Sequence, residues 1–250
     1  MNLYEQVERL LTDGALVEAK AILDGLLDRD AQDALALTLL GALHALRGRF
    51  DDAIDVLERA TAIDARGYGA LFLLGQALYK VGRPAASVFV EAADAAPSEK
   101  HRIRALLGAA RCLVDRGRPG EALSLFVEAG LLPAGAASSD LNSPDVFHDA
   151  QIASIPDAGV SALLYAMYGS GNYAGVRRLG LALADRNGNL RTNAVLAEVV
   201  PVSLLRLGLK DEAAKLHLRI VAAGGRATDF RPSWRSAQLA RLDPALAQEL

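Results

Sequence analysis

Aromatic side chains are scarce in this sequence. Phe, Tyr and Trp make up only 5% of its 250 residues, although 52% of the residues are apolar. Ala and Leu therefore supply most of the apolar total. β-Sandwiches and barrels depend on aromatic and β-branched residues, whereas Ala and Leu lead the ranking of helix propensities. The composition thus predicts an all-α protein whose helices pack closely through small side chains.

Cysteine and long apolar runs are also nearly missing. The single Cys112 excludes an internal disulfide or a zinc cluster, and we expect it to be a small core side chain. The apolar stretch from Ala34 to Leu46 is too short to cross a bilayer. The N-terminal segment lacks the basic and then apolar pattern of a signal peptide. We therefore expect a soluble, cytoplasmic protein without membrane insertion.

Neither sign of charge dominates, because 27 Lys and Arg face 30 Asp and Glu, for a net charge of −3. This balance gives no overall electrostatic reason to expect nucleic-acid binding. Locally, residues 1–33 carry eight acidic and three basic side chains, whereas residues 98–119 carry six basic and two acidic ones. This polarity suits steering of an acidic partner and head-to-tail self-association alike. Solvated helix faces would also carry such charges.

Glycines recur along the chain at a nearly constant spacing. Four of them are separated by 34, 34 and 35 residues: Gly14, Gly48, Gly82 and Gly117. A period in this range is typical of repeat architectures. An apolar helical pattern precedes each glycine and another follows it, and glycine readily adopts the left-handed conformation that ends a helix. Each unit is therefore predicted to be a helix–turn–helix hairpin.

Two slots of the first helix repeat on one helix face, because they are four residues apart. The slot eleven residues before the glycine holds Leu3, Leu37, Leu71 and Leu106. The slot seven residues before it holds Val7, Gly41, Gly75 and Ala110. The small residues of the second slot are predicted to let a neighbouring helix approach closely.

The second helix of each unit has its own repeated slots. Positions five and nine after the glycine hold Ala19 and Leu23, Ala53 and Leu57, and Ala122 and Phe126. The third unit needs a one-residue deletion, which places Ala86 and Val90 in these slots. Proline is predicted at the helix start, at Pro84 and Pro119. Acidic residues are predicted in the first turn, where they favour the helix dipole: Glu18, Asp52, Glu121 and Glu212.

These residues resemble the tetratricopeptide repeat (TPR) family, in the form known from bacterial solenoid proteins. The second unit matches best, with Leu37, Leu40-Gly41, Gly48, Phe50, Ala53, Leu57 and Ala60. The third follows with Leu71, Leu74-Gly75, Tyr79, Gly82 and Pro97. The resemblance implies a right-handed superhelical solenoid of antiparallel helix hairpins. It also implies a concave groove, lined by the first helices, that commonly binds peptides or partner helices.

The organisation predicted from this pattern has four parts. Residues 1–130 form four TPR-like hairpins, and residues 131–156 form an inserted loop or short helix. Residues 157–226 form two degenerate hairpins, in which Pro201 is expected to kink or delay a helix. Residues 227–250 form a C-terminal capping helix, as the last repeat of a solenoid requires.

Residues with catalytic or metal-binding chemistry do not assemble into a recognisable motif. No Gly-x-x-x-x-Gly-Lys-Ser/Thr sequence is present, and the four histidines are scattered along the chain. His148 with Asp145 and Asp149 is the only group that resembles a set of acid–base catalytic residues, and no nucleophile accompanies it. The sequence therefore predicts no catalytic residue, no metal site and no cofactor.

Transfer of the family's groove positions by register gives a candidate partner-binding set. It consists of Tyr4, Glu8, Thr38, Phe72, Gln76, Tyr79, Lys80, Arg104, Leu107, Arg111, Tyr165 and Tyr168. Ordinary helix-surface or packing residues would occupy the same positions, so that alternative stays open. The family's carboxylate clamp is not supported, because Tyr4, Glu8 and Leu39 stand at its Lys and Asn positions.

The leading hypothesis is a non-enzymatic adaptor or scaffold that holds a protein or peptide in its concave groove. Aromatic and basic groove residues suit a partner with acidic groups. A self-associating structural scaffold, and thus a homo-oligomer, is the first alternative. A small-molecule-sensing or enzymatic protein that uses residues 131–156 is the second.

Overall fold

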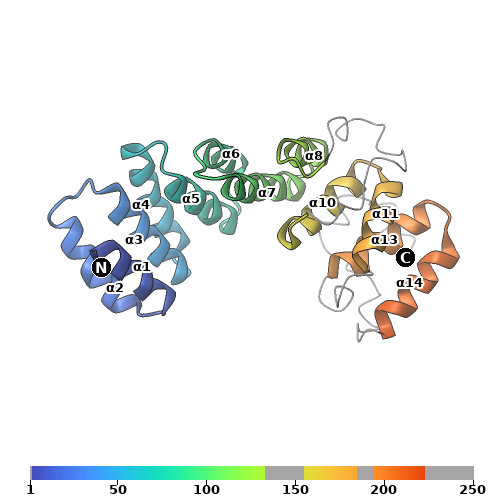
Figure 1. Cartoon of the computed structure of the whole chain (residues 1–250), viewed down its shortest axis with the longest axis horizontal. Helices are drawn as coiled ribbons and strands as arrows, with labels where there is room; N and C mark the ends of the chain where they lie inside the picture. The colour runs from blue at the N-terminus through green and yellow to red at the C-terminus, as the bar shows by residue number, and fades with distance from the viewer. Residues whose placement is uncertain (1, 133–154, 185–193, 223–250) are drawn as a thin grey trace. The chain divides into compact units, whose positions relative to one another are not determined.

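The computed structural model describes residues 2–132, 155–184 and 194–222. Within these ranges the chain forms twelve α-helices and no strand (Figure 1). They divide into two compact units, and the division falls after Cys112. The predicted all-α fold is therefore confirmed for the described residues. Most of the predicted insertion at 131–156 and the whole predicted capping helix at 227–250 lie outside them.

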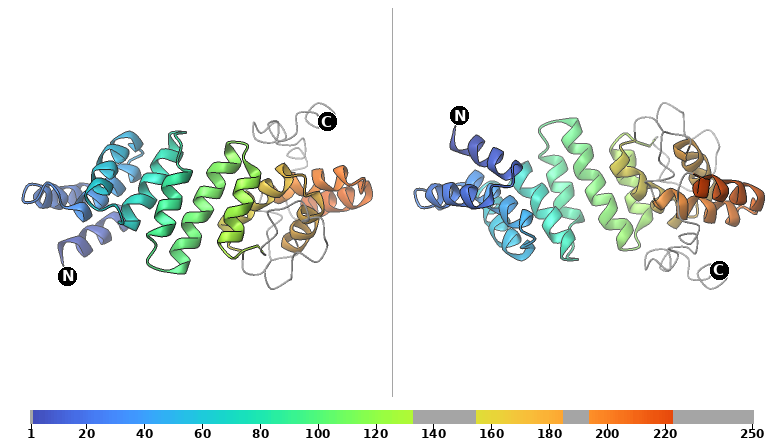
Figure 2. Two further views of the ribbon diagram at one scale, coloured as in Figure 1. Left: turned by 90° about the horizontal axis from the view of Figure 1, so that it is seen from above. Right: turned by 90° about the horizontal axis from the view of Figure 1, so that it is seen from below.

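The first unit contains three helix hairpins and most of the next helix. Its helices are α1 (Leu3–Thr12), α2 (Leu16–Leu27), α3 (Ala34–Leu46), α4 (Phe50–Ile63), α5 (Tyr68–Lys80), α6 (Ala86–Asp94) and α7 (Glu99–Asp115), which continues past the division. The hairpins follow one another in chain order, as the change from blue to green shows in Figures 1 and 2.

The second unit contains the helices that follow. They are α8 (Pro119–Glu128), α10 (Asp157–Gly169), α11 (Tyr173–Ala184), α13 (Ala194–Arg206) and α14 (Lys210–Ala222). In this unit α8 packs against α10, and α11 packs against α13. Gly180 lies on the second contact, because a Cβ at this position would come within 2.2 Å of Val200 Cγ2. Pro201 lies inside α13 and does not delay its start, which is already at Ala194.

The hairpin turns share one geometry. The glycine of each turn has a φ between 70° and 77°, and these glycines are Gly14, Gly48, Gly82, Gly117, Gly171 and Gly208. The residue after each glycine donates its backbone N–H to the carbonyl five positions earlier, at 2.8 or 2.9 Å. This is the Schellman pattern, which satisfies carbonyls that the helix end leaves open. The predicted role of the four repeated glycines is therefore confirmed.

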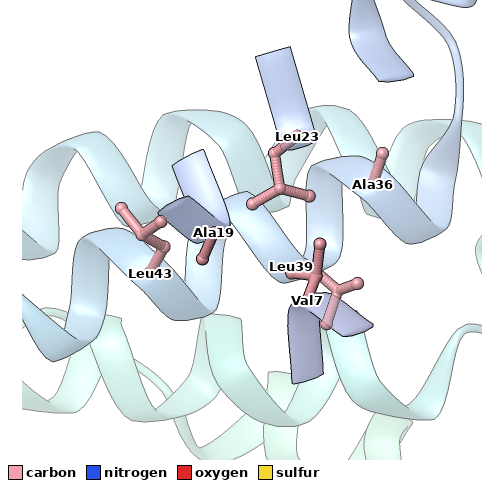
Figure 3. Packing of buried hydrophobic residues seen from close by; sticks show 6 residues of the cluster. All are labelled: Val7, Ala19, Leu23, Ala36, Leu39 and Leu43. Carbon is pink, nitrogen blue, oxygen red and sulfur yellow. The ribbon is translucent and has the colours of Figure 1, made fainter. Parts of the chain in front are cut away.

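Small and branched aliphatic side chains build the core of the first two hairpins. One cluster joins α1, α2 and α3 and consists of Val7, Ala19, Leu23, Ala36, Leu39 and Leu43 (Figure 3). Gly41 makes room for Leu57, because a Cβ at Gly41 would lie 2.5 Å from Leu57 Cγ. Cys112 is fully buried, as expected for a small core side chain. Leu3 departs from its slot, since it is 41% exposed.

The predicted one-residue deletion in the third hairpin is wrong. Ala85, the N-cap residue of α6, and Phe89 are buried in these slots, whereas Ala86 and Val90 are only partly buried. Phe89 packs on Gly75 as Leu57 packs on Gly41, so the turn is shorter by two residues rather than one. For the same reason Pro84 lies in the turn, before the N-cap residue of α6. Only Pro119 begins a helix as predicted.

Acidic residues occupy the first turn of the second helices, as predicted. They are Glu18 in α2, Asp52 in α4, Glu121 in α8 and Glu212 in α14. Two of them bind the arginine that precedes their helix, since Arg49 Nε contacts Asp52 at 2.5 Å and Arg118 Nε contacts Glu121 at 2.6 Å. Each of these arginines is thereby held at its hairpin turn.

Candidate partner-binding surface

Aromatic and basic side chains form three successive pairs between α5 and α7. The rings of Tyr68 and His101 meet edge to face, with centroids 5.0 Å apart. The guanidinium carbon of Arg104 lies 4.6 Å from the ring centroid of Phe72, and that of Arg111 lies 5.2 Å from the ring centroid of Tyr79. We call these six residues the α5–α7 ladder: Tyr68, Phe72, Tyr79, His101, Arg104 and Arg111.

Two glycines and one phenylalanine explain why α5 and α7 come close enough for these pairs. A Cβ at Gly75 of α5 would lie 3.0 Å from the Phe89 ring, and one at Gly108 of α7 would lie 2.9 Å from it. The Phe89 ring also meets the Phe72 ring edge to face, with centroids 5.6 Å apart. Phe89 of α6 is thus packed between the two helices, and the absence of side chains at both glycines makes room for it.

The ladder has buried rings and exposed cations. Phe72 is only 8% exposed, and Tyr79 is half-buried, whereas Arg104 and Arg111 are exposed. Burial raises the pKa of the Tyr68 hydroxyl, and this hydroxyl donates to the carbonyl of His101 at 3.4 Å. A guanidinium over a ring gains about 0.5–1 kcal/mol at an exposed site. The rings therefore hold the two cations in place at the surface.

The arginines of α7 and its neighbourhood differ in their partners. Arg102 binds Glu99 at 3.3 Å, and Arg118 binds Glu121. Among the described residues, no carboxylate forms an ion pair with Arg104 or Arg111, which rest on rings instead. A guanidinium that stacks by its face keeps the N–H groups of its edge available, and these match a carboxylate in bidentate geometry.

Other predicted groove residues flank the ladder. Gln76 and Lys80 of α5 are exposed, and Leu107 of α7 is buried at 9% exposure. On α5, Gln76 lies between the turns that carry Phe72 and Tyr79, on the same helix face. Leu107 is therefore a packing residue, while Gln76 and Lys80 present polar groups beside the two arginines.

The predicted residues of the first two hairpins lie outside the ladder. The Tyr4 hydroxyl donates to Asp33 Oδ2 at 2.5 Å, and this hydrogen bond is the main reason why the pKa of Tyr4 is raised. Asp33 Oδ1 accepts from backbone N–H groups in the first turn of α3, so Tyr4 joins α1 to the start of α3. Thr38 donates to the Ala34 carbonyl within α3, and Glu8 is exposed on α1.

The two predicted tyrosines of the second unit are buried. Tyr165 is 7% exposed and Tyr168 is 2% exposed. The Tyr168 ring packs edge to face on Tyr173, with centroids 5.3 Å apart. Both side chains therefore belong to the core of α10 and its neighbours, and we leave them out of the binding surface proposed below.

Sequence reasoning missed four residues that shape the ladder: Tyr68, His101, Gly108 and Phe89. Tyr68 and His101 precede Phe72 and Arg104 by one helical turn on the same face, and this periodicity is a signal that could have found them. Phe89 was hidden by the two-residue deletion in its hairpin. Gly108 lies outside the repeated slot that holds Ala110, so the spacing gave no signal for it.

The described histidines show one unusual environment. His44 is buried, and its Nδ1 has no hydrogen-bond partner. Burial lowers the pKa of His44, and the nearby cations of Arg49, Arg47 and Lys20 lower it further, while Asp52 opposes them. The predicted group of His148, Asp145 and Asp149 lies outside the described residues, as does the side chain of His217.

The described residues contain neither a metal-binding cluster nor a membrane-spanning helix. No group of three or more His, Cys, Asp or Glu side chains there is arranged to hold a metal ion. No helix in the same ranges combines the length and the apolar character that are needed to cross a bilayer.

Comparison with known proteins identifies repeat motifs in two segments of the chain. Two sequence models of the tetratricopeptide repeat match it, over residues 36–67 and 103–128. No curated protein matches the chain in sequence. The stacked hairpins define the class as an α-helical repeat protein. The two matched segments are tetratricopeptide repeats, and the predicted resemblance to this family is thereby confirmed.

Solved structures show the same fold at low sequence identity. PilF of Pseudomonas aeruginosa is 18% identical with a TM-score of 0.64, and the match covers 94% of this chain and 95% of PilF. YrrB, described as a TPR protein with an unusual peptide-binding site, is 12% identical with a TM-score of 0.60, covering 82% and 94%. The apo form of the quorum sensor NprR of B. thuringiensis is 16% identical with a TM-score of 0.58, covering 96% and 67%.

Proposed function

We propose that this protein is a non-enzymatic interaction scaffold that binds an acidic segment of another protein on the α5–α7 ladder. The observation that carries the proposal is the pair of exposed guanidiniums held over buried or half-buried rings. The TPR fold supports it, since this fold is a protein-interaction scaffold. The peptide-binding site named for YrrB is in keeping with a peptide as the partner.

The ladder has the composition of a binding hot spot. Aromatic residues and arginine carry most of the binding energy in protein interfaces. The ring contacts already fix Arg104 and Arg111, so less side-chain freedom is lost when a partner binds. Lys80 adds a third exposed cation on α5, whose thirteen residues contain no Asp or Glu. The surface therefore complements carboxylates.

A binding role explains the ladder better than a catalytic one does. Ser98 Oγ lies 2.7 Å from His101 Nδ1, which brings a hydroxyl and a base together. However, the two residues are three positions apart at the start of α7, where such a contact is a local feature of the helix end. We therefore infer that the ladder binds its partner without chemical conversion.

Selection of peptides on the intact protein tests this function. A displayed peptide library should yield acidic ligands, and Arg104→Glu combined with Arg111→Glu should abolish their binding. Helix content should stay unchanged, since both side chains are exposed, and the melting temperature should fall by only a few degrees from the loss of two guanidinium–ring contacts. Arg29→Glu combined with Arg66→Glu is the matched control, because it makes the same change of charge at two other exposed arginines. Equal binding by the ladder variant and the control would contradict the proposal.

A self-associating scaffold is the second candidate function. The observation that favours it is an apolar pair at the edge of the first two hairpins, where Val17 is 74% exposed and Leu46 is 59% exposed. Their chain neighbours are in contact, because Arg47 Nη2 donates to the Leu16 carbonyl at 3.1 Å. Light scattering of the wild type and of Val17→Glu would separate the candidates. A monomer at all concentrations would remove the second one.

The third alternative, a sensor or enzyme built on residues 131–156, depends on a segment that is mostly outside the described residues. It stays a prediction from the sequence.

A further inference from the structure

The two arginines of the ladder stand at a fixed distance along α7. Arg104 and Arg111 are seven residues apart in one continuous helix. Seven residues are nearly two helical turns, so the two side chains leave the same face about 10 Å apart along the axis. Each one rests on its own ring, Phe72 or Tyr79, which are also seven residues apart on α5. The spacing of the cations is therefore built into both helices.

The conformation of a bound segment decides which of its side chains match this spacing. In a polyproline II conformation every third side chain lies on the same side, about 9 Å along the chain. In a β-strand, side chains three residues apart point to opposite faces. In a helical partner, residues seven apart are about 10 Å apart on one face. An extended polyproline II segment and a helix can therefore both span the two arginines.

Gln76 favours the extended segment. Its exposed amide lies on α5 between the turns of Phe72 and Tyr79, and so between the two cations. An amide both donates and accepts hydrogen bonds. The backbone groups of an extended segment need such partners, whereas those of a helix are already paired inside the helix.

The net charge of the protein favours a short acidic motif over a nucleic acid. The protein as a whole carries a net charge of −3. Residues 98–119 are locally basic, with six basic and two acidic side chains, and Glu99 is paired with Arg102, so α7 by itself attracts either kind of anion.

We propose that the ladder recognises two acidic side chains three residues apart in an extended protein segment, one carboxylate on Arg104 and the other on Arg111. The inference rests on the proposed function, since it names the chemistry of the same partner. The Gln76 amide hydrogen-bonds the backbone of the segment between its two carboxylates.

Fluorescence anisotropy with the full chain and a designed peptide series tests the spacing. The host peptide is rich in proline and glutamine, which favours polyproline II. Two Glu residues are placed one, three or five positions apart, and a further peptide carries one Glu. We expect the three-position peptide to bind about tenfold more tightly than the others, because only this peptide gains a second charged hydrogen-bonded pair.

Substitution of either arginine distinguishes the spacing rule from general attraction. In Arg104→Gln or Arg111→Gln, the three-position peptide should bind no better than the single-Glu peptide. Arg66→Gln, an exposed control, should leave the spacing preference intact. If all two-Glu peptides bind equally and all lose affinity in the arginine variants, the spacing rule is wrong while the proposed function stands.

Two further measurements test the other possible partners, a helical segment and a nucleic acid. A helix-stabilised peptide with two Glu seven positions apart should bind more weakly than the extended peptide, and tighter binding would overturn the extended conformation. A single-stranded oligonucleotide should compete poorly with the three-position peptide. Equal competition would overturn the proposal, because the arginines would then recognise phosphates along a polyanion. Failure of the whole series to bind would overturn it as well, whereas the library selection judges the proposed function separately.

Discussion

Two contacts between first helices of neighbouring hairpins differ in their chemistry. Between α3 and α5, the neighbouring groups are small: the Thr38 methyl lies 3.6 Å from the position that a Cβ at Gly69 would take. Between α5 and α7, rings and guanidiniums meet instead, in the pairs of Phe72 with Arg104 and Tyr79 with Arg111. The repeat thus keeps its backbone frame, while the side chains at one contact form the surface that we propose for partner binding.

The second helices of the same hairpins explain part of this difference. In the second hairpin an aliphatic side chain, Leu57, fills the space over Gly41. In the third hairpin an aromatic one, Phe89, fills the space over Gly75 and also reaches Gly108 and the Phe72 ring. A larger side chain over glycines on both neighbours therefore connects the core to the ladder.

Removal of the two core side chains should have the largest effect. Phe89→Ala should lower the free energy of unfolding by about 3–5 kcal/mol, and Leu57→Ala by about 2–5 kcal/mol, because each leaves a cavity. Only Phe89→Ala should also weaken binding of acidic peptides, since the Phe89 ring contacts the ring beneath Arg104. Urea unfolding followed by circular dichroism, and peptide anisotropy of the folded proteins, measure the two effects. An equal loss of peptide binding in Leu57→Ala would contradict the claim that Phe89, and not Leu57, connects the core to the ladder.

Addition of a methyl group at the glycines should have the next largest effect. Gly108→Ala and Gly75→Ala should each cost about 1–3 kcal/mol, because the new Cβ would meet the Phe89 ring at 2.9 or 3.0 Å. The double variant Gly108→Ala with Phe89→Leu should recover part of this loss. Gly120→Ala is the control, since nothing lies within 4 Å of its Cβ position, and it should be neutral or stabilising. Thermal melting measures all of these variants.

The turn glycines should respond equally in the two hairpins. Gly48 has a φ of 72° and Gly82 has a φ of 75°, and nothing lies within 4 Å of either Cβ position. Alanine should therefore cost about 1–2 kcal/mol at each site, from the left-handed backbone alone. A much larger loss at Gly82, measured by urea unfolding, would show that the shortened third hairpin depends on its turn in a way that the second does not.

Acidification should lower the free energy of unfolding through His44 in the second hairpin, and this effect should be the smallest. Burial lowers the pKa of His44 below its ordinary value of 6.5, so the unfolded chain takes up this proton first as the pH falls. The contribution of His44 to stability is therefore complete above about pH 6.5 and declines below it, toward the folded-state pKa. Urea unfolding between pH 7.5 and 5.5 should show this decline in the wild type and a smaller one in His44→Gln. Identical pH profiles of unfolding for the wild type and His44→Gln would contradict the lowered pKa of His44.

The fold was predictable because it repeats. Glycine spacing identifies the turns, and slots at a common distance from each turn identify Leu37, Ala53 and Leu57 as core residues, all of which are fully buried. The exception is the third hairpin, where the sequence alone does not fix how many residues the turn lacks relative to the other hairpins. Only the contact between Phe89 and Gly75 selects the two-residue one.

The candidate surface was less predictable, because register assigns a helix face but not the depth of a side chain. Arg104 and Arg111 are exposed as the groove prediction requires, whereas Phe72 lies beneath Arg104. Tyr165 and Tyr168 share that register in the second unit, yet they are buried. Depth depends on what neighbouring helices place over a residue, and no single-helix pattern contains this information.

Exchange of charges across the proposed contact tests the ladder most directly. The wild type should bind a peptide with two Glu residues three positions apart and should not bind the same peptide with two Lys residues. The variant with Arg104→Glu and Arg111→Glu should show the opposite preference, measured by fluorescence anisotropy at low salt. A variant that loses the Glu peptide without gaining the Lys peptide, or that binds both peptides as the wild type does, would contradict the assignment of the α5–α7 ladder as the binding surface.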